Sequence, residues 1–331
     1  MRSIGVILVL AAAVPPAHAA DRIFRHSFEN PVDCIATPTN PECPTFTIAS
    51  PTITVAPGVA ASTCFYFTAP NTATRGITRI QSNITGNAWY VVVGATYASG
   101  TNTPAARHPP GTVTQGDCSV DSGNTNGTDS YRIYQAHANE QALEMPANDG
   151  TGVPVAIEWQ AGQPLFLEIV APNATAEPIQ AQVTLGIDAL PTGAPYTRTE
   201  MLLTYNSQIA IPPSSGATAS AVCPVPAGVK FWHFTTHTHQ RASSATLQAF
   251  PSFDTFVVTT NPAAPLIQEF GPPFYTFTGG DQLRYACNYF NPENFIILSG
   301  ADELTDENCV GIGYFFPATR PRICLNNTLI P

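Results

Sequence analysis

Proline and glycine divide the chain into short segments, and this spacing restricts the fold more than any other feature. The 331 residues include 32 prolines and 23 glycines. Between them lie runs rich in β-branched and aromatic residues, among them ITVAP, CFYFTAP, WYVVVGATY, LFLEIVA, AQVTLGI, TFVVTT and FIILSG. Strand-length runs bounded by turn formers predict an all-β fold of sandwich or barrel type. No long stretch shows the period of an amphipathic helix.

Two stretches with the same order of features indicate two domains in tandem. ITVAPGVAASTCFYF begins at Ile53 and IAIPPSSGATASAVCPV begins at Ile209, and each runs from alternating apolar residues through proline to cysteine. The segment 189–200 contains Pro and Gly without a strand pattern, so we place the boundary there. We therefore predict two antiparallel β-sandwiches of jelly-roll-like type, over residues 45–195 and 196–331.

The N-terminus has the pattern of a secretory signal peptide. Arg2 precedes an apolar run from Ile4 to Val14, and the small-x-small sequence AHA follows. We expect a signal peptide over residues 1–20, a Pro-rich extension over 21–44, and a secreted or periplasmic location. The apolar run is shorter than the roughly 20 residues that a spanning helix needs, so we expect no membrane insertion.

The charge of the chain argues against some classes of partner. Its 13 basic and 23 acidic residues give a formal net charge of −10. Nucleic acids and anionic membranes attract basic surfaces, so we expect neither as a partner. The sequence leaves room for a small molecule or a reductant and indicates no particular protein partner.

Eight cysteines follow the predicted signal peptide. An even number in an exported chain predicts disulfides, because the compartment is oxidising. Spacing alone leaves about 105 pairings open, although a local Cys34–Cys43 loop is the simplest. No CxxC occurs, which argues against a cysteine-ligated zinc. The cysteines are Cys34, Cys43, Cys64, Cys118, Cys223, Cys287, Cys309 and Cys324.

Three of the seven histidines lie in the stretch HFTTHTHQR. The surrounding sequence, Phe231 to Phe250, reads as a strand, on which residues i and i+2 share a face and lie roughly 6.6 Å apart. His237 and His239 can therefore converge on one ion, and imidazole suits copper, zinc or iron. His233 lies about 13 Å from His237 along such a strand and should not join them. A solvated histidine strand is the alternative interpretation of this short motif.

Five features in order across residues 207–317 resemble the copper type II ascorbate-dependent monooxygenases. They are SQIAIPP, the cysteine Cys223, HTHQR, GGDQLRYACNYF and TDENCVGIGYFFP. The resemblance implies the pairs Cys287–Cys309, Cys223–Cys324 and Cys64–Cys118, which leaves Cys34 with Cys43. It also implies one copper site in each of two β-sandwich domains.

The resemblance places the second-domain copper on His237, His239 and a methionine, but Asn308 stands at the methionine position. An amide oxygen is harder than a thioether and suits copper(I) less well. The first-domain copper of the family is the electron donor, and its histidines should fall near Ala88, Trp89 and Val170. We expect that site to be absent.

Other positions also depart from the family. Its peptide-binding arginine and tyrosine correspond to Thr235 and Ile312, so a peptide C-terminus is not the expected ligand. We expect His108 and His137 to be exposed loop histidines. The carboxylates Asp302, Glu303, Asp306 and Glu307 are expected to form a solvated acidic loop, with a hard-metal site as the alternative.

The sequence thus predicts a secreted protein that resembles these monooxygenases and binds one copper ion through His237, His239 and Asn308. Paired-copper hydroxylation is not expected, and no catalytic residue is identified. One alternative is an active copper-dependent monooxygenase that hydroxylates a small substrate with O2 and an external reductant such as ascorbate. The other is a metal-free secreted binding or scaffold module.

Overall fold

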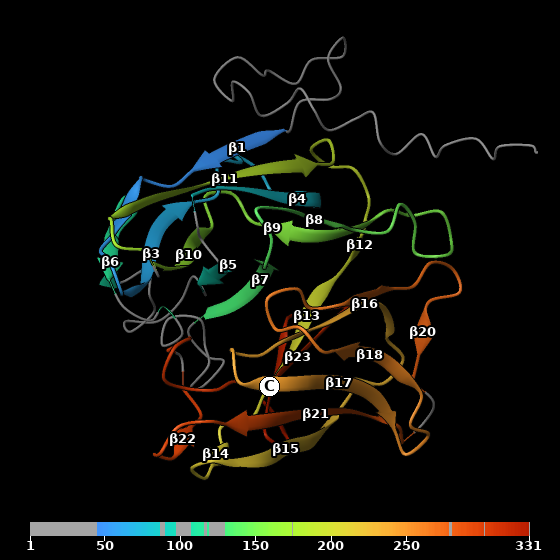
Figure 1. The fold of residues 1–331 in the computed structure, drawn as a ribbon. Coiled ribbons are helices and arrows are strands. Elements are labelled where there is room, and N and C mark those ends of the chain that lie inside the picture. Colours follow the sequence, from blue (N-terminus) through green and yellow to red (C-terminus); the bar gives the residue numbers. More distant parts are fainter. Residues whose placement is uncertain are drawn as a thin grey trace, which may run out of the picture. The chain divides into compact units, whose positions relative to one another are not determined.

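The structure, a computed structural model, describes residues 45–86, 90–96, 107–115, 118, 130–173, 175–277, 280–300 and 302–330. The named elements in these ranges are all β-strands, which confirms the predicted all-β fold (Figure 1). None of the described residues belongs to a helix that is long and apolar enough to cross a membrane. The predicted signal peptide and the extension with Cys34 and Cys43 lie outside the described ranges.

The first half of the described chain forms two sheets. The first sheet has the order β1-β11-β4-β9-β12, with β2 paired to β11 and β8 paired to β4. The second sheet has the order β6-β3-β10-β5-β7. The strands are β1 Phe46–Ala49, β2 Ile53–Val55, β3 Ala60–Thr68, β4 Arg75–Thr85, β5 Tyr90–Thr96, β6 Val113–Gln115, β7 Ser130–Ala136, β8 Glu140–Glu144, β9 Val155–Trp159, β10 Pro164–Pro172, β11 Ile179–Ala189 and β12 Thr197–Arg198.

The second half forms a further pair of sheets and a small two-stranded sheet, β14-β22. The third sheet has the order β19-β16-β23-β13-β24-β25, with β20 paired to β16, and the fourth has the order β15-β21-β17-β18. The strands are β13 Glu200–Tyr205, β14 Ala210–Ile211, β15 Ser215–Pro224, β16 Lys230–His237, β17 Ala242–Phe250, β18 Thr255–Thr259, β19 Ile267–Glu269, β20 Tyr275–Thr276, β21 Gln282–Asn291, β22 Ile297–Leu298, β23 Val310–Phe316, β24 Arg322–Leu325 and β25 Thr328–Ile330.

Strand β23 lies between two hydrophobic cores and is buried along its whole length. Because side chains alternate between the faces of a strand, its even-numbered and odd-numbered residues enter different cores. Ile312 and Tyr314 pack with Trp159 and Leu167 of the first half. Phe315 packs with residues of the fourth sheet. One face of the third sheet therefore packs in the core of its own sandwich. The other face packs in the core that extends into the first half.

Membership of the sheets changes between β12 and β13, close to the predicted domain boundary. One core nevertheless contains side chains from both sides of this boundary. The Tyr314 hydroxyl on β23 donates a hydrogen bond to the carbonyl of Ile133 on β7, at 2.8 Å. The β-sandwich fold is thus confirmed, and the division into domains 45–195 and 196–331 stays a prediction.

Three disulfides lie in the described residues, and they are pairs that the family resemblance implies. Cys64–Cys118, Cys223–Cys324 and Cys287–Cys309 have Cα atoms 5.9, 6.0 and 5.8 Å apart. Cys287 belongs to β21 and Cys309 directly precedes β23, so that bridge joins the fourth sheet to the third.

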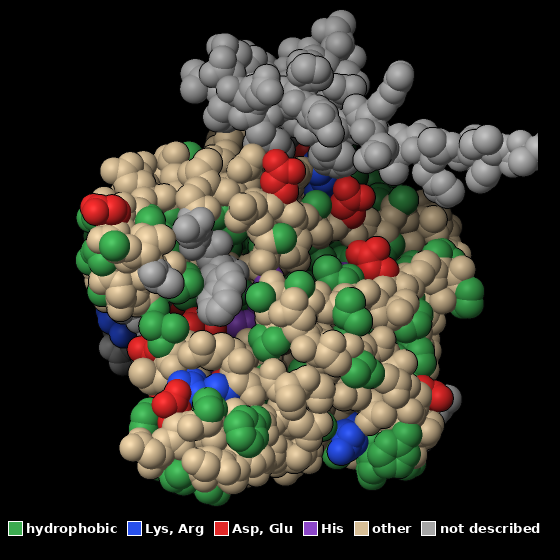
Figure 2. All heavy atoms as spheres, in the orientation of Figure 1, with side chains coloured by type: hydrophobic (Ala, Val, Ile, Leu, Met, Phe, Trp, Pro, Cys, Tyr) green, Lys and Arg blue, Asp and Glu red, His purple; other side chains and the backbone are tan. Residues whose placement is uncertain are grey.

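Charged residues make up 11% of the chain. Figure 2 shows them scattered thinly over one face, among hydrophobic and uncharged polar atoms.

Candidate metal centre

Strand β16 directs His237 toward the first half of the chain. In the β16–β23 register His237 lies opposite Val310, and Thr235 lies opposite Ile312. Residues opposite each other in an antiparallel pair share a face of the sheet. Since Val310 and Ile312 belong to the core that both halves share, His237 lies on that face too.

His239 lies in a turn rather than on a strand, so the predicted strand from Phe231 to Phe250 is wrong. Strand β16 ends at His237 and β17 begins at Ala242. The loop 302–309 provides hydrogen-bond partners for the intervening turn, which lets the chain leave the sheet. The two imidazoles still lie close together, with ring centroids 5.4 Å apart.

The contacts of His239 fix which of its ring nitrogens carries the hydrogen. Its Nδ1 lies 3.0 Å from the carbonyl oxygen of Asp306. A carbonyl oxygen only accepts, so Nδ1 carries the hydrogen and the Nε2 of the neutral ring keeps a lone pair. Asn308 Nδ2 donates to this Nε2 at 2.8 Å. Burial lowers the pKa of His239 to about 4, so the ring is neutral at neutral pH.

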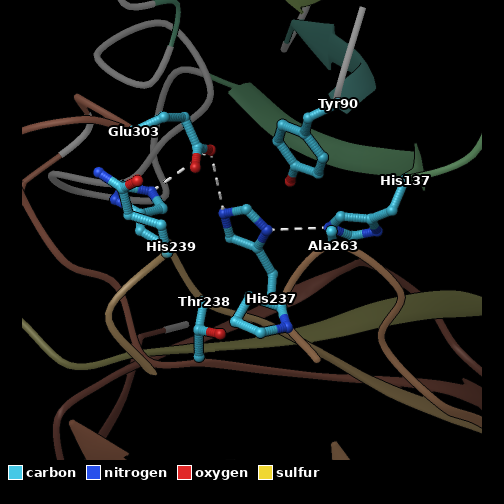
Figure 3. Close-up of a pocket in the computed structure, with 9 residues that line it drawn as sticks. Tyr90, His137, His237, Thr238, His239, Ala263 and Glu303 are labelled. Carbon is cyan, nitrogen blue, oxygen red and sulfur yellow. Dashed lines mark hydrogen bonds and ion pairs between the residues drawn. The ribbon is translucent and has the colours of Figure 1, made fainter. Parts of the chain in front are cut away.

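Glu303 completes a group of three potential ligands. One of its oxygens, Oε1, lies 3.5 Å from His237 Nε2 and 3.4 Å from His239 Nε2 (Figure 3). One ligand atom from each of the three residues lies within 4.8 Å of the others. Burial raises the pKa of Glu303 to about 8, and the nearby Glu168 and Glu307 add to this effect. Two imidazoles and a carboxylate are a common ligand set for divalent metals.

The expectation of a solvated acidic loop is wrong for Glu303 and Glu307, whose exposed fractions are 9% and 0%. Asp302 is exposed, as expected. The buried Glu307 accepts a hydrogen bond at its Oε1 from the Arg241 backbone N–H, at 2.7 Å. This bond connects the loop 302–309 to the turn that follows β16. The Arg241 guanidinium lies 3.8 Å from the same oxygen. The hard-metal alternative therefore fits the position of Glu303.

Asn308 lies beside His239 and is buried. Its side-chain oxygen, Oδ1, has no hydrogen-bond partner among the described atoms. Its backbone carbonyl accepts from the Tyr289 hydroxyl at 2.8 Å, and Cys309 follows it directly. A buried amide oxygen without a partner is costly.

The first half supplies two further side chains to this cluster. The Tyr90 ring stacks on the His237 ring, with centroids 4.4 Å apart and planes 16° apart. Atom Nε2 of His137 lies 2.9 Å from Nδ1 of His237. The Tyr90 hydroxyl accepts from Arg132 Nη1 at 2.6 Å and donates to Gln135 Oε1 at 3.0 Å. The expectation that His137 is exposed is therefore wrong.

The imidazoles are held in the neutral form, which is the form that binds metals. Burial lowers the pKa of His137 to about 3, and Arg132 lowers it further. Burial also lowers the pKa of His237 well below its usual value, with His137 and His239 adding to the effect.

A small cavity lies against the donors. Its volume is about 20 Å³, which is room for about one water molecule. The space beside the donors thus suits an ion with a small ligand. The lining residues are Tyr90, His137, His237, Thr238, His239, Gln240, Pro262, Ala263 and Glu303.

His233, Thr235 and Ile312 lie outside the cluster around His237 and His239. His233 Nδ1 is 3.5 Å from Glu269 Oε1, and His233 is not part of the His237–His239–Glu303 group, as predicted. Thr235 donates to the Leu266 carbonyl at 2.9 Å. Ile312 is fully buried in the core.

The remaining first-half positions contribute no described metal donor. His108 stacks on Tyr66, with centroids 4.5 Å apart, and is half-buried rather than exposed. Val170 lies opposite Tyr90 in the register of β10 and β5. Ala88 and Trp89 lie outside the described residues, so the absence of the electron-donor site stays a prediction.

Sequence reasoning missed Glu303 as an individual donor, and it missed Tyr90 and His137. No short-range pattern separates Glu303 from the other three acidic residues of its loop. The contact of His137 with His237 joins residues 100 positions apart, which only the packing of the two halves determines.

The donors fit a copper ion in its divalent state. Neutral imidazole nitrogens suit copper, and a carboxylate or an amide oxygen favours copper(II) over copper(I). The Nε2 atoms of His237 and His239 both lie within about 3.5 Å of one oxygen of Glu303, which supports a cation between these three residues.

A search of curated proteins finds no match to this chain. Among solved structures, "Crystal Structure of the STIV MCP" is 9% identical, covers 82% of this chain and 96% of its own, and has a TM-score of 0.36. The major capsid protein P2 from bacteriophage PM2 is 11% identical, with 81% and 97% coverage and a TM-score of 0.31. At these TM-scores neither likeness bears on the function.

A protein-family comparison gives a direct result for the second half. Residues 198–329 match the family described as "Copper type II ascorbate-dependent monooxygenase, C-terminal domain". The matched range contains His237, His239, Glu303 and Asn308. The second half of this chain is therefore similar to the C-terminal domain of the copper type II ascorbate-dependent monooxygenases.

Proposed function

We propose that this chain is an exported protein whose second half binds one copper ion through His237, His239 and Glu303. The observation that carries the proposal is the convergence of one ligand atom from each residue within 4.8 Å. All three side chains are buried, and the imidazoles are neutral. Asn308 adjoins this group, because its Nδ2 lies 2.8 Å from His239 Nε2, and it would have to turn its amide over to offer Oδ1 as a further ligand.

The donor set supports copper(II) more than copper(I). The family uses a thioether where this chain has Asn308, and Glu303 adds a carboxylate, so both differences make the donors harder. Bound copper would supply a centre that exchanges electrons with a reductant or with O2. The residues of the chain would hold the imidazoles neutral, keep the carboxylate near them and restrict the adjoining space to small ligands.

The proposal includes one metal ion and no paired-copper hydroxylation. Of the first-half positions expected to hold the electron-donor copper, Val170 is the one in the described residues, and it packs in an apolar cluster with Tyr90 and the Cys64–Cys118 disulfide. Three disulfides support the exported location, because such bonds persist in oxidising compartments.

Metal analysis of the folded, secreted protein purified without chelator tests the proposal. We expect one copper per chain in the wild type and loss of tight binding in His237→Ala, His239→Ala and Glu303→Ala. His108→Ala is the matched control, because it removes a ring-stacked histidine outside the cluster, and it should bind as the wild type does. A wild-type protein that takes up no metal would instead support the metal-free scaffold.

An oxygen-consumption assay with ascorbate then separates binding from catalysis. We expect no hydroxylation coupled to oxygen uptake. Substantial uptake that depends on His237 would favour the active monooxygenase.

A further inference from the structure

We propose that His137, from the first half of the chain, is a positioning residue for the metal site. It would hold His237 in the tautomer that keeps Nε2 free for a metal. The inference rests on the metal site proposed above and concerns a residue that the family match does not cover, since that match begins at residue 198.

The contact between the two rings defines the role. His137 Nε2 lies 2.9 Å from His237 Nδ1, a hydrogen-bond distance (Figure 3). The other ring nitrogen of His237, Nε2, faces Glu303 at 3.5 Å. The ring therefore has its potential metal-binding nitrogen on the side of the carboxylate and its second nitrogen on the side of His137.

The chemistry of a neutral imidazole then requires an acceptor at Nδ1. Such a ring carries one hydrogen and one lone pair on different nitrogens, so a metal at Nε2 requires the hydrogen on Nδ1. His237 is buried, and a buried N–H without a partner is costly. His137 Nε2 offers the acceptor, and ligating histidines commonly donate their second N–H in this way.

His137 is itself held in place by its own strand and turn. It follows β7 directly, and its backbone N–H donates to Gln141 Oε1 at 2.9 Å. Strand β7 is in turn attached to the third sheet through the hydrogen bond from Tyr314 to Ile133. The acceptor is therefore placed before any metal binds.

Tyr90 constrains the same ring in a second direction. Its ring stacks on the face of His237, whereas His137 contacts the edge. Hydrogen bonds with Arg132 and Gln135 fix the hydroxyl of Tyr90. Stacking sets the plane of the His237 ring, and the hydrogen bond sets which nitrogen carries the hydrogen.

Two substitutions separate this role from simple packing. His137→Gln places an amide oxygen near the position of Nε2 and retains an acceptor. His137→Leu fills similar space without one. We expect His137→Leu to weaken metal affinity about 10- to 100-fold, the usual effect of losing such a partner, and His137→Gln to stay close to the wild type. His108→Ala is again the control.

The decisive experiment is nitrogen NMR of the His237 side chain in the metal-free protein, followed by copper(II) titration of the same samples. In the wild type and in His137→Gln we expect a hydrogen on Nδ1 and a free Nε2. In His137→Leu we expect a mixture of the two tautomers.

A hydrogen on Nε2 in the wild type, or equal affinities of His137→Leu and the wild type, would overturn the inference. If the wild type bound no metal, the proposed function would fail, and the NMR result would still decide whether His137 sets the tautomer.

Discussion

Asn308 is the side chain that we expect to set which oxidation state of copper the proposed site favours. Its Nδ2 lies 2.8 Å from His239 Nε2, so the position that the family fills with methionine adjoins the imidazole pair. The amide and the carboxylate of Glu303 together make the donors hard. A site of this kind should hold copper(II) more firmly than copper(I).

Asn308→Met should reverse part of this preference. Methionine adapts to irregular space, so the buried position should accept it, and its thioether would lie beside His239. We expect copper(I) affinity to rise relative to copper(II), because sulfur is the softer donor. Competition with a copper(I) chelator measures the change. An unchanged ratio of the two affinities would show that residue 308 does not bind the metal.

The local sequence was enough to identify His237, His239 and Asn308 as candidate ligands, but it was not enough to identify Glu303. His237, His239 and Asn308 belong to short motifs, and a motif keeps its residue types at fixed spacing. Glu303 belongs to an acidic loop in which charge alone predicts exposure. Its burial depends on the contacts of the loop with Arg241 and with the turn after β16.

At the scale of elements, the loop 302–309 depends on what anchors its ends. Cys309 ends the loop and is bonded to Cys287 on β21. The sequence around His237 predicted a strand, but it could not predict where that strand ends. The end is set by hydrogen bonds of the turn to Asp306 and Glu307, which lie far away in the sequence.

Replacing both Cys287 and Cys309 by alanine should weaken both the fold and the site. Loss of a disulfide typically costs about 2–4 kcal/mol in the free energy of unfolding. Copper affinity should fall as well, because Asn308 adjoins Cys309. Alanine at Cys223 and Cys324 is the matched control, with a similar loss of stability but unchanged affinity. Urea unfolding and copper titration measure the two quantities, and equal affinities in both double variants would contradict the anchoring role.

At the scale of the whole molecule, the proposed metal site depends on how the two halves pack. The proline and glycine spacing was enough to predict an all-β fold, because strand length and alternation are local properties. It could not predict that His137 and Tyr90 meet His237, because that contact arises from the shared core. Tyr314 illustrates this packing, since it joins β23 to β7.

Tyr314→Phe should loosen this connection. Ile133 lies at an irregularity in the register of β5 and β7, and the Tyr314 hydroxyl donates to its buried carbonyl. Losing that donor should reduce the free energy of unfolding by about 1–3 kcal/mol. Copper affinity should also fall, since β7 leads into His137.

Tyr285→Phe provides the comparison, because the Tyr285 hydroxyl donates to carbonyls of Tyr205 and Asn326 within the second half. It should reduce stability and leave affinity unchanged. Urea unfolding with copper titration distinguishes the two variants. Unaltered stability of Tyr314→Phe would count against the role of this hydrogen bond.

The most direct test of the metal site is anomalous X-ray diffraction at the copper edge from copper(II)-loaded crystals. We expect one anomalous peak within about 2.0–2.2 Å of Nε2 of His237, Nε2 of His239 and an oxygen of Glu303, the usual distances for such ligands. Bound copper found only elsewhere in the molecule, or no ordered copper at all, would contradict the proposed site.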